Sequence, residues 1–338
     1  MPVSGRVVVL TTGGTIASSF DAAKGSVSAS LSVGDLLDGL KTDGLPDVEG
    51  RNILTKNSAS LSLDDAELII NTIVIERARA DVAGIVVTHG TDTLEETAFL
   101  ADLMLEPGKP VVFTGAQTAA DERHSDGPRN LADAIRVAGS AQARNLGVLV
   151  VFDGDVLAAR DATKMHSARH YTFRAPDGPL GHIDEDVLRL TRALAPYPRF
   201  PLVAPARPVD LITLTLGGGE RLVRLIVDNP PKGLVLSATG RGNATPLIAE
   251  MVAELDAKKI PVLITSRSPE GRVAPIYGQG GGADLKRAGA IFCGDMSGPK
   301  ARLLLAVILG QKVQGDIAAQ VANVTDATLT RATLTRET

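Results

Sequence analysis

Short runs of apolar, mostly β-branched residues alternate with helix-like segments along most of this chain. This alternation is typical of β-α units on a parallel sheet. In the first half it predicts strands over residues 7–10, 52–55, 84–88, 111–114 and 147–152, with helices over 33–40, 63–79, 94–103 and 130–141. In the second half it predicts strands over 209–214, 233–237, 261–265 and 290–292, with helices over 220–228, 245–258 and 298–309.

The chain has 338 residues, which is long for one hydrophobic core, so two domains are expected. A polar, proline-rich stretch over about 174–207 separates the two alternating regions and is interpreted as a connection. We therefore predict an α/β fold with mainly parallel sheets in both domains. The larger N-terminal domain is expected over 1–190, the linker over 191–212 and the smaller C-terminal domain over 213–338.

Composition excludes several classes of function. The formal charge of −4 argues against a nucleic-acid partner. No apolar run approaches the roughly 20 residues needed to cross a bilayer, and the first residues lack the apolar core of a signal peptide. The single cysteine, Cys293, permits no intrachain disulfide and is interpreted as a small core residue. We expect a cytoplasmic protein with no membrane contact.

Two threonine-containing turns each follow a predicted strand. The first is TGGT at 12–15, and the second is THGTDT at 88–93. Glycine permits tight turns and close backbone approach. Because ligands of parallel sheets bind at the carboxyl ends of strands, we expect one pocket containing two hydroxyls and a carboxylate.

Each turn also has an ordinary structural interpretation. Thr93 and Glu96 have capping-box spacing, which places Thr91 and Asp92 just before a helix N-terminus. The helix dipole there favours an ionised Asp92, which could anchor a ligand ammonium group. A capped strand-to-helix turn would explain the same pattern. Thr15 could be a nucleophile if a base lies nearby, or part of a plain turn.

A third segment, RDATK at 160–164, would by itself suggest only a surface lysine, Lys164. Together, however, the segments resemble the bacterial L-asparaginase family along nearly the whole chain. The two threonine motifs, in this order and spacing, are highly specific. The matching segments are TGGTIA at 12–17, THGTDTLEETA at 88–98, DGP at 126–128 with NL at 130–131, GVLVV at 147–151, GPLG at 178–181 and KAR at 300–302.

The resemblance implies hydrolysis of the side-chain amide of asparagine, and often of glutamine less well, with release of ammonia. It places the nucleophile, which forms a covalent acyl ester, at Thr15. It places the second catalytic group at Thr91, Asp92 and Lys164, and the contact to the substrate carboxylate at Ser58. Members of the family are typically homotetramers, in which a neighbour's C-terminal domain completes each site.

The chemistry of amide hydrolysis agrees with this assignment. An amide carbonyl is a poor electrophile, so covalent catalysis divides the barrier into two steps. The developing oxyanion needs donors, and we expect them among the backbone N–H groups around Gly14, Gly90 or the Gly115–Ala116 turn. No metal or other cofactor is predicted. His166 and His170 are four residues apart, but they lack the glutamate of a metalloprotease helix motif.

The sequence departs from the family pattern near the substrate. The loop over 18–31 contains no tyrosine, whereas family members usually place one there, close to the nucleophile. Ala59 follows Ser58, where a glutamine or glutamate that contacts the substrate amino group is common. Ala59 therefore stays in the predicted substrate-binding set as a position without a polar contact. We expect a less strict requirement at the substrate α-carbon, or a weaker KM, than is usual in the family.

Further departures fall in the C-terminal domain. A glutamate supplied by a neighbouring subunit would correspond to a position near Gly282, and a polar partner to one near Asn243 or Thr245. Tyr277 is a candidate to replace the absent phenol across an interface, although ordinary loop packing explains it equally well.

Three alternatives remain open. A glutaminase-asparaginase or a D-asparagine hydrolase would use the same residues with a different preference. A non-catalytic amino-acid sensor would keep the binding residues and lose turnover. The related amidase subunit of a transamidosome is disfavoured, because the N-terminal extension expected of it is absent.

Overall fold

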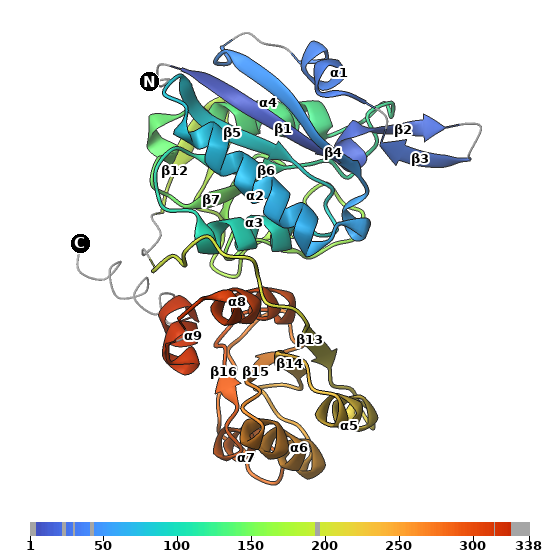
Figure 1. Cartoon of the computed structure of the whole chain (residues 1–338). Coiled ribbons are helices and arrows are strands. Elements are labelled where there is room, and N and C mark those ends of the chain that lie inside the picture. Colours follow the sequence, from blue (N-terminus) through green and yellow to red (C-terminus); the bar gives the residue numbers. More distant parts are fainter. Residues whose placement is uncertain are drawn as a thin grey trace. The chain divides into compact units, whose positions relative to one another are not determined.

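The computed structural model describes residues 5–21, 25–29, 31–40, 44–192, 197–313 and 315–325. It divides into two compact units, Met1–Leu194 and Ala195–Thr338. Both are α/β units with mainly parallel sheets (Figure 1), and the N-terminal unit is the larger, so the predicted fold class is confirmed.

An eight-stranded sheet forms the centre of the N-terminal unit, in the order β12-β11-β8-β7-β6-β5-β1-β4. Its parallel part consists of β1 (Arg6–Gly13), β4 (Val48–Lys56), β5 (Val82–Thr88), β6 (Val111–Thr114) and β7 (Val148–Phe152). Its antiparallel extension consists of β8 (Asp155–Ala158), β11 (Gly181–Asp184) and β12 (Val187–Leu190). Two separate hairpins pair β2 (Ser18–Asp21) with β3 (Ser26–Ala29), and β9 (Thr163–Lys164) with β10 (Phe173–Arg174).

Helices cover both faces of this sheet (Figure 1). On one face, α1 (Val33–Asp38) and α4 (Gly127–Ala138) pack against a core of valine, leucine and alanine side chains from the strands. On the other lie α2 (Leu63–Ala78) and α3 (Leu94–Met104). Short 3-10 helices occur at η1 (Thr15–Ala17), η2 (Ser58–Ser60) and η3 (Ala141–Ala143).

The sequence explains where these elements form. Every residue of β5 is buried, as expected for a central parallel strand written as a continuous apolar run. At the start of α2, the Ser62 hydroxyl accepts from the Asp65 N–H while the Asp65 carboxylate accepts from the Ser62 N–H. Lys56 donates to the same carboxylate at 2.7 Å, and with the Ser62 bonds it lowers the pKa of Asp65 to about 2.

The C-terminal unit contains a four-stranded parallel sheet in the order β13-β14-β15-β16. One face is covered by α8 (Gly298–Gly310), and the core of the other contains side chains of α5 (Glu220–Asp228), α6 (Pro246–Ala257) and α7 (Gly282–Arg287). A final helix, α9 (Ile317–Thr325), contacts α8. The strands are β13 (Val209–Thr213), β14 (Gly233–Ala238), β15 (Val262–Ser266) and β16 (Ile291–Phe292).

The interpretation of residues 174–207 as a connection was wrong for its first part. Strands β11 and β12 form an antiparallel hairpin there, and β11 pairs with β8 at the edge of the large sheet. Along β11 buried and exposed residues alternate, which is the pattern of a strand with one solvated face. Prolines on both sides hid this short alternation. The predicted linker over 191–212 stays a prediction.

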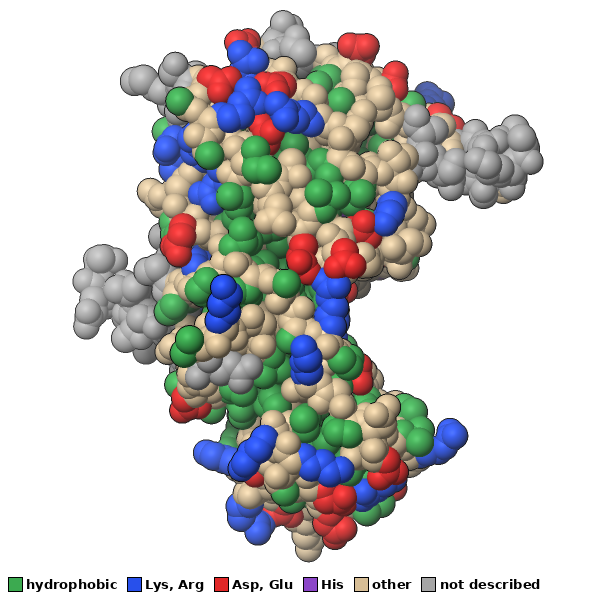
Figure 2. Space-filling model, in the orientation of Figure 1, with side chains coloured by type: hydrophobic (Ala, Val, Ile, Leu, Met, Phe, Trp, Pro, Cys, Tyr) green, Lys and Arg blue, Asp and Glu red, His purple; other side chains and the backbone are tan. Residues whose placement is uncertain are grey.

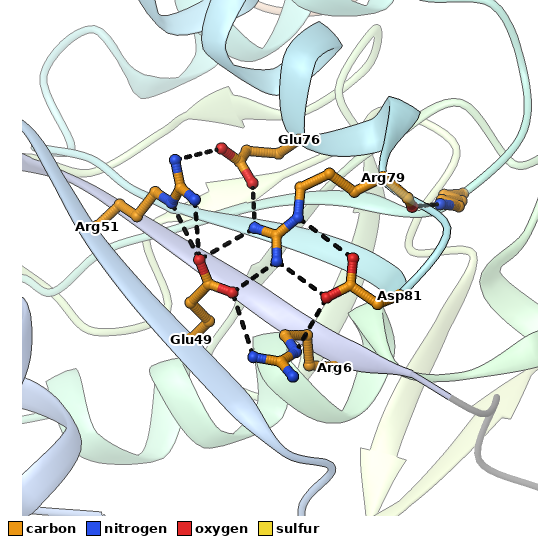
Figure 3. A network of polar contacts seen from close by, with 7 residues as sticks. Arg6, Glu49, Arg51, Glu76, Arg79 and Asp81 are labelled. Atoms are coloured by element: carbon orange, nitrogen blue, oxygen red, sulfur yellow. Dashed lines mark hydrogen bonds and ion pairs between the residues drawn. The ribbon is translucent and has the colours of Figure 1, made fainter.

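A network of ion pairs joins the amino-terminal ends of β1, β4 and β5 to the end of α2 (Figure 3). Arg79 lies at its centre and bonds the Glu49 carboxylate at 2.8 and 3.0 Å and Glu76 at 2.7 Å. The bonds from Arg79 and then Arg51 lower the pKa of Glu49 to about 2. Figure 2 shows basic and acidic side chains intermixed on this part of the unit. The members are Arg6, Glu49, Arg51, Glu76, Arg79 and Asp81.

None of the helices in the described ranges has the length and apolar character that a bilayer crossing requires.

Candidate active site

The two threonine turns leave the same edge of the large sheet. Strands β1 and β5 are parallel neighbours, with Thr11 opposite Thr88. Both strands therefore end side by side, and the turn over 12–15 lies next to the turn over 89–93. This is the edge at which open parallel sheets bind ligands.

The backbones of Gly14 and Gly90 lie against each other where the two turns meet. A Cβ atom added to Gly14 would lie 2.5 Å from both the N and the Cα of Gly90, far inside van der Waals contact. Gly14 also has φ of +80°, which favours glycine. Thr15 and Thr91 each follow one of these touching residues. Thr15 is half-buried at the start of η1.

The substitution Gly14→Ala is expected to destabilise the N-terminal unit by roughly 2–4 kcal/mol, because it adds overpacking to backbone strain. It should also separate the two turns and lower any activity of the site by about 100-fold. Gly44→Ala is the matched control, since Gly44 has φ of +78° but no described atom within 4 Å of its added Cβ. Urea unfolding of both variants tests this, and equal stabilities would contradict the contact.

Thr91, Asp92 and Lys164 form a compact polar group. The Lys164 ammonium, on β9, donates to the Thr91 hydroxyl at 2.8 Å and to the Asp92 carboxylate at 2.7 Å. The Thr91 residue is buried, the Lys164 side chain is 15% exposed and the Asp92 side chain is 56% exposed. Glu95, on α3, accepts a bond from the main-chain N–H of Lys164 and so fixes the base of that side chain. The exposed carboxylate is open to a ligand cation.

The capping box predicted at Thr93 was wrong. Thr93 does precede α3, but its hydroxyl makes no cap bond and instead donates to the Ser58 carbonyl at 2.9 Å. The Thr93 carbonyl accepts from the N–H groups of Glu96 and Thr97. The hydroxyl therefore ties η2 to the second turn rather than capping the helix.

Ser58 and Ala59 lie beside this group. Ser58 is 1% exposed, and its hydroxyl oxygen has no hydrogen-bond partner among the described residues. A Cβ added to Gly90 would lie 2.5 Å from that oxygen, so Ser58 packs directly on the second turn. Ala59 is exposed and carries no polar side-chain atom. A buried hydroxyl without a partner is costly unless something binds it.

The side chain of His89 makes a hydrogen bond within the second turn. It is fully buried, and its Nδ1 lies 2.8 Å from the Gly90 carbonyl oxygen, which can only accept. Burial lowers the pKa of His89 to about 4, so the ring is neutral with its proton on Nδ1 at physiological pH. In the described part of the chain, no group of three or more His, Cys, Asp or Glu residues is placed to hold a metal ion.

Two residues near the site were missed by the sequence analysis as individual candidates. Gln117 follows β6 and accepts a bond from the Thr91 hydroxyl at 2.9 Å. Asp126 precedes α4, and its carboxylate accepts from the main-chain N–H groups of Gln117 and Thr118 at 3.0–3.1 Å. Asp126 belongs to the DGP motif at 126–128, but only the tertiary structure shows that it bonds the loop at residues 117–118.

The positions singled out in the C-terminal unit lie close to one another within that unit. The Asn243 side chain accepts from the Gly282 N–H at 3.3 Å, and Thr245 caps α6 while donating to Glu220 at 2.6 Å. Tyr277 is 55% exposed, and its main-chain carbonyl accepts from the Ala283 N–H.

Known proteins resemble this chain in sequence and structure. The profile for "Asparaginase, N-terminal" matches residues 6–195, and that for the "Glutaminase/Asparaginase C-terminal domain" matches residues 208–321. A probable L-asparaginase of Deinococcus radiodurans is 40% identical over 242 residues, which is 70% of this chain and 74% of that protein. An L-asparaginase of Bacillus licheniformis is 32% identical over 315 residues, covering 92% of this chain and 97% of the relative.

A solved structure has the same architecture. The probable cytoplasmic L-asparaginase of Campylobacter jejuni superposes with a TM-score of 0.84 at 26% identity, covering 94% of this chain and 99% of that protein. Both domain profiles, the two relatives and the shared fold agree. The chain belongs to the asparaginase family.

Proposed function

We propose that this protein hydrolyses the side-chain amide of L-asparagine to L-aspartate and ammonia through a covalent acyl-threonine intermediate. Family membership supports the reaction. The observation that carries the mechanism is the hydrogen bond that Lys164 donates to the Thr91 hydroxyl. Gly90, which precedes Thr91, contacts Gly14, which precedes Thr15. This contact supports the placement of the Thr15 hydroxyl next to the Thr91 hydroxyl, which is already bonded to an amine.

In the first step, the Thr15 oxygen attacks the amide carbonyl carbon and its proton passes to Thr91. Backbone N–H groups around Gly14, Gly90 and the Gly115–Ala116 turn stabilise the oxyanion. The C–N bond then breaks, ammonia leaves with a proton from the Thr91–Lys164 pair, and the acyl group remains on Thr15. Water attacks this ester in the second step, which releases aspartate and restores the Thr15 hydroxyl.

Substrate binding is assigned to the groups that surround this pair. The Ser58 hydroxyl would bond the substrate α-carboxylate, because it is a buried donor that has no partner among the described residues. Asp92 would bond the substrate ammonium group, which competes with Lys164 for the same carboxylate. Gly14, Ala59 and Gly90 would line the substrate through backbone and apolar contacts.

The absence of a polar side chain at Ala59 leads to a prediction about specificity. Each missing charge-assisted hydrogen bond to the substrate amino group removes roughly 1.5–3 kcal/mol of recognition. We therefore expect kcat/KM values for L-asparagine, D-asparagine and succinamate to agree within about tenfold. Coupled ammonia assays with these amides and L-glutamine measure this, and they also test the proposed function.

The outcomes separate the alternatives. Strict preference for L-asparagine would contradict the looseness but support the activity. Highest turnover with L-glutamine or D-asparagine would favour the corresponding variant activity. Binding of asparagine without release of ammonia would favour the sensor and overturn the proposed function.

We also propose a homotetramer in the cytoplasm, with each site completed by the C-terminal unit of a neighbour. The family resemblance supports the assembly. Asn243 or Thr245 is the candidate polar partner and Tyr277 the candidate for the absent phenol, whereas Gly282 marks the position that lacks the family's glutamate. The likeness to the probable cytoplasmic L-asparaginase of Campylobacter jejuni supports the compartment.

A further inference from the structure

Among the described residues the Thr91 hydroxyl has two hydrogen-bond partners, and together they determine where its proton points. Lys164 Nζ donates to the Thr91 oxygen at 2.8 Å. The Thr91 hydroxyl in turn donates its only proton to Gln117 Oε1 at 2.9 Å. The remaining lone pair of the oxygen is therefore available to an incoming O–H group.

Tertiary contacts fix the orientation of the Gln117 amide. Its Nε2 donates to the main-chain carbonyl of Arg169 at 3.2 Å and to that of His166 at 3.5 Å. Carbonyl oxygens only accept, so the NH₂ group must face them and Oε1 must face Thr91. The backbone of Gln117 is held as well, because its N–H donates to both oxygens of the Asp126 carboxylate at 3.1 Å.

We propose that Gln117 is a positioning residue of the amide hydrolysis, which takes up the Thr91 proton and so keeps the Thr91 oxygen an acceptor toward the attacking group. This inference rests on the proposed function. Without Gln117 the hydroxyl can rotate and donate to Thr15, which would make that oxygen a weaker nucleophile.

Gln117 also opposes the neutral form of Lys164. A neutral amine could accept the Thr91 proton, but only after the bond from Thr91 to Gln117 breaks. During catalysis the Thr15 proton moves to Thr91, and the Thr91 proton moves to the neutral amine of Lys164. The bond from Thr91 to Gln117 is then replaced by a bond from Thr91 to Lys164. Without Gln117, the neutral amine of Lys164 can accept the Thr91 proton and no other hydrogen bond has to break.

Two substitutions at this position should shift the pH profile in opposite directions. Gln117→Met removes both the acceptor and the donor at similar size, so the ascending limb of kcat should move to lower pH. Gln117→Glu keeps an acceptor but adds a negative charge near Lys164, which favours the ammonium form and moves the limb to higher pH. A purely structural role would not give shifts of opposite sign.

The size of the effect on turnover follows from one hydrogen bond. In Gln117→Met, kcat on the plateau should fall about tenfold. KM should stay within about threefold of wild type, because Gln117 bonds neither Asp92 nor Ser58. Thr118→Val is the matched control: it removes the neighbouring hydroxyl, which bonds His170 at 2.7 Å and does not bond Thr91.

Other ionisable groups near the pair stay the same in all variants. Asp92 and Glu95 bond the ammonium and the main-chain N–H of Lys164. Asp126 bonds the main chain of Gln117. The main-chain carbonyl of His166 accepts from the Gln117 side chain, and the His170 ring bonds the neighbouring Thr118 hydroxyl. A shift confined to the Gln117 variants is therefore assigned to that side chain.

The deciding experiment combines kinetics with an observation that does not need turnover. Steady-state pH profiles are measured for wild type, both Gln117 variants and Thr118→Val, after thermal melting shows each to be folded. NMR titration of ¹³C-labelled lysine then follows Lys164 directly. Opposite displacements of the Lys164 titration in the two Gln117 variants support the proposal, and unchanged titration overturns it. Failure of wild type to release ammonia would overturn the proposed function instead.

Discussion

Thr15→Ala is expected to lower ammonia release from L-asparagine by at least about 10⁴-fold, because the variant keeps the binding groups but loses the nucleophile. The expectation follows from the position of Thr15, directly after the glycine that touches Gly90. KM or the dissociation constant for L-asparagine should change little, since the alanine removes no contact assigned to the substrate carboxylate or ammonium group.

Thr12→Val is the matched control for this substitution. Thr12 belongs to the same turn, but its hydroxyl is buried and donates to the Thr88 carbonyl at 2.9 Å. Losing that bond should lower stability by about 1–3 kcal/mol while leaving activity in the folded fraction. Acid-quenched mass spectrometry of wild type with substrate should find the acyl group on the Thr15 peptide. An acyl group on Thr91, or a tenth of wild-type activity in Thr15→Ala, would sink the assignment.

Lys164→Met should lower kcat by about 10³-fold, because it removes the only amine bonded to Thr91 in the described structure. Lys164→Arg should be nearly as damaging, since guanidinium keeps its charge but does not release a proton at accessible pH. Small alkylamines added to Lys164→Ala should restore part of the rate, with a pH dependence that follows the amine.

Lys56→Met controls for the loss of an ion-paired lysine. Lys56 Nζ lies 2.7 Å from Asp65, at the start of α2, and bonds neither Thr91 nor Asp92. Its removal should leave kcat within about twofold of wild type, because no transition-state contact is lost. If Lys164→Met behaved like Lys56→Met, the lysine would be structural and the proposed proton pathway wrong.

The fold could be predicted where local pattern and tertiary role agree. Strand β5 is apolar throughout because it is buried on both faces, and the predicted end of α2 is only one residue beyond the observed one. The sequence pattern failed where a contact with residues far away in the sequence determines the local structure. Strand β11 forms by pairing with the free edge of β8, and β12 pairs with β11 in turn. The Thr93 hydroxyl does not cap α3 because it bonds the Ser58 carbonyl instead.

The site shows the same division. The threonine motifs indicated which residues to examine, and the register of β1 with β5 explains why two distant turns share one edge. Gln117 could not be found this way, because its orientation depends on carbonyls about fifty residues later in the chain. The roles of Thr15, Thr91, Asp92 and Lys164 stay predictions until the substitutions are measured.

The meeting of Gly14 and Gly90 limits how this enzyme could be re-engineered or could diverge. A larger residue at position 14 would push against the backbone of Gly90, and a larger residue at position 90 would push against the Ser58 side chain. A mutagenesis library aimed at new amides should therefore hold both glycines constant. Variation belongs at position 59 instead, because Ala59 is exposed and lies outside the contact between the two turns.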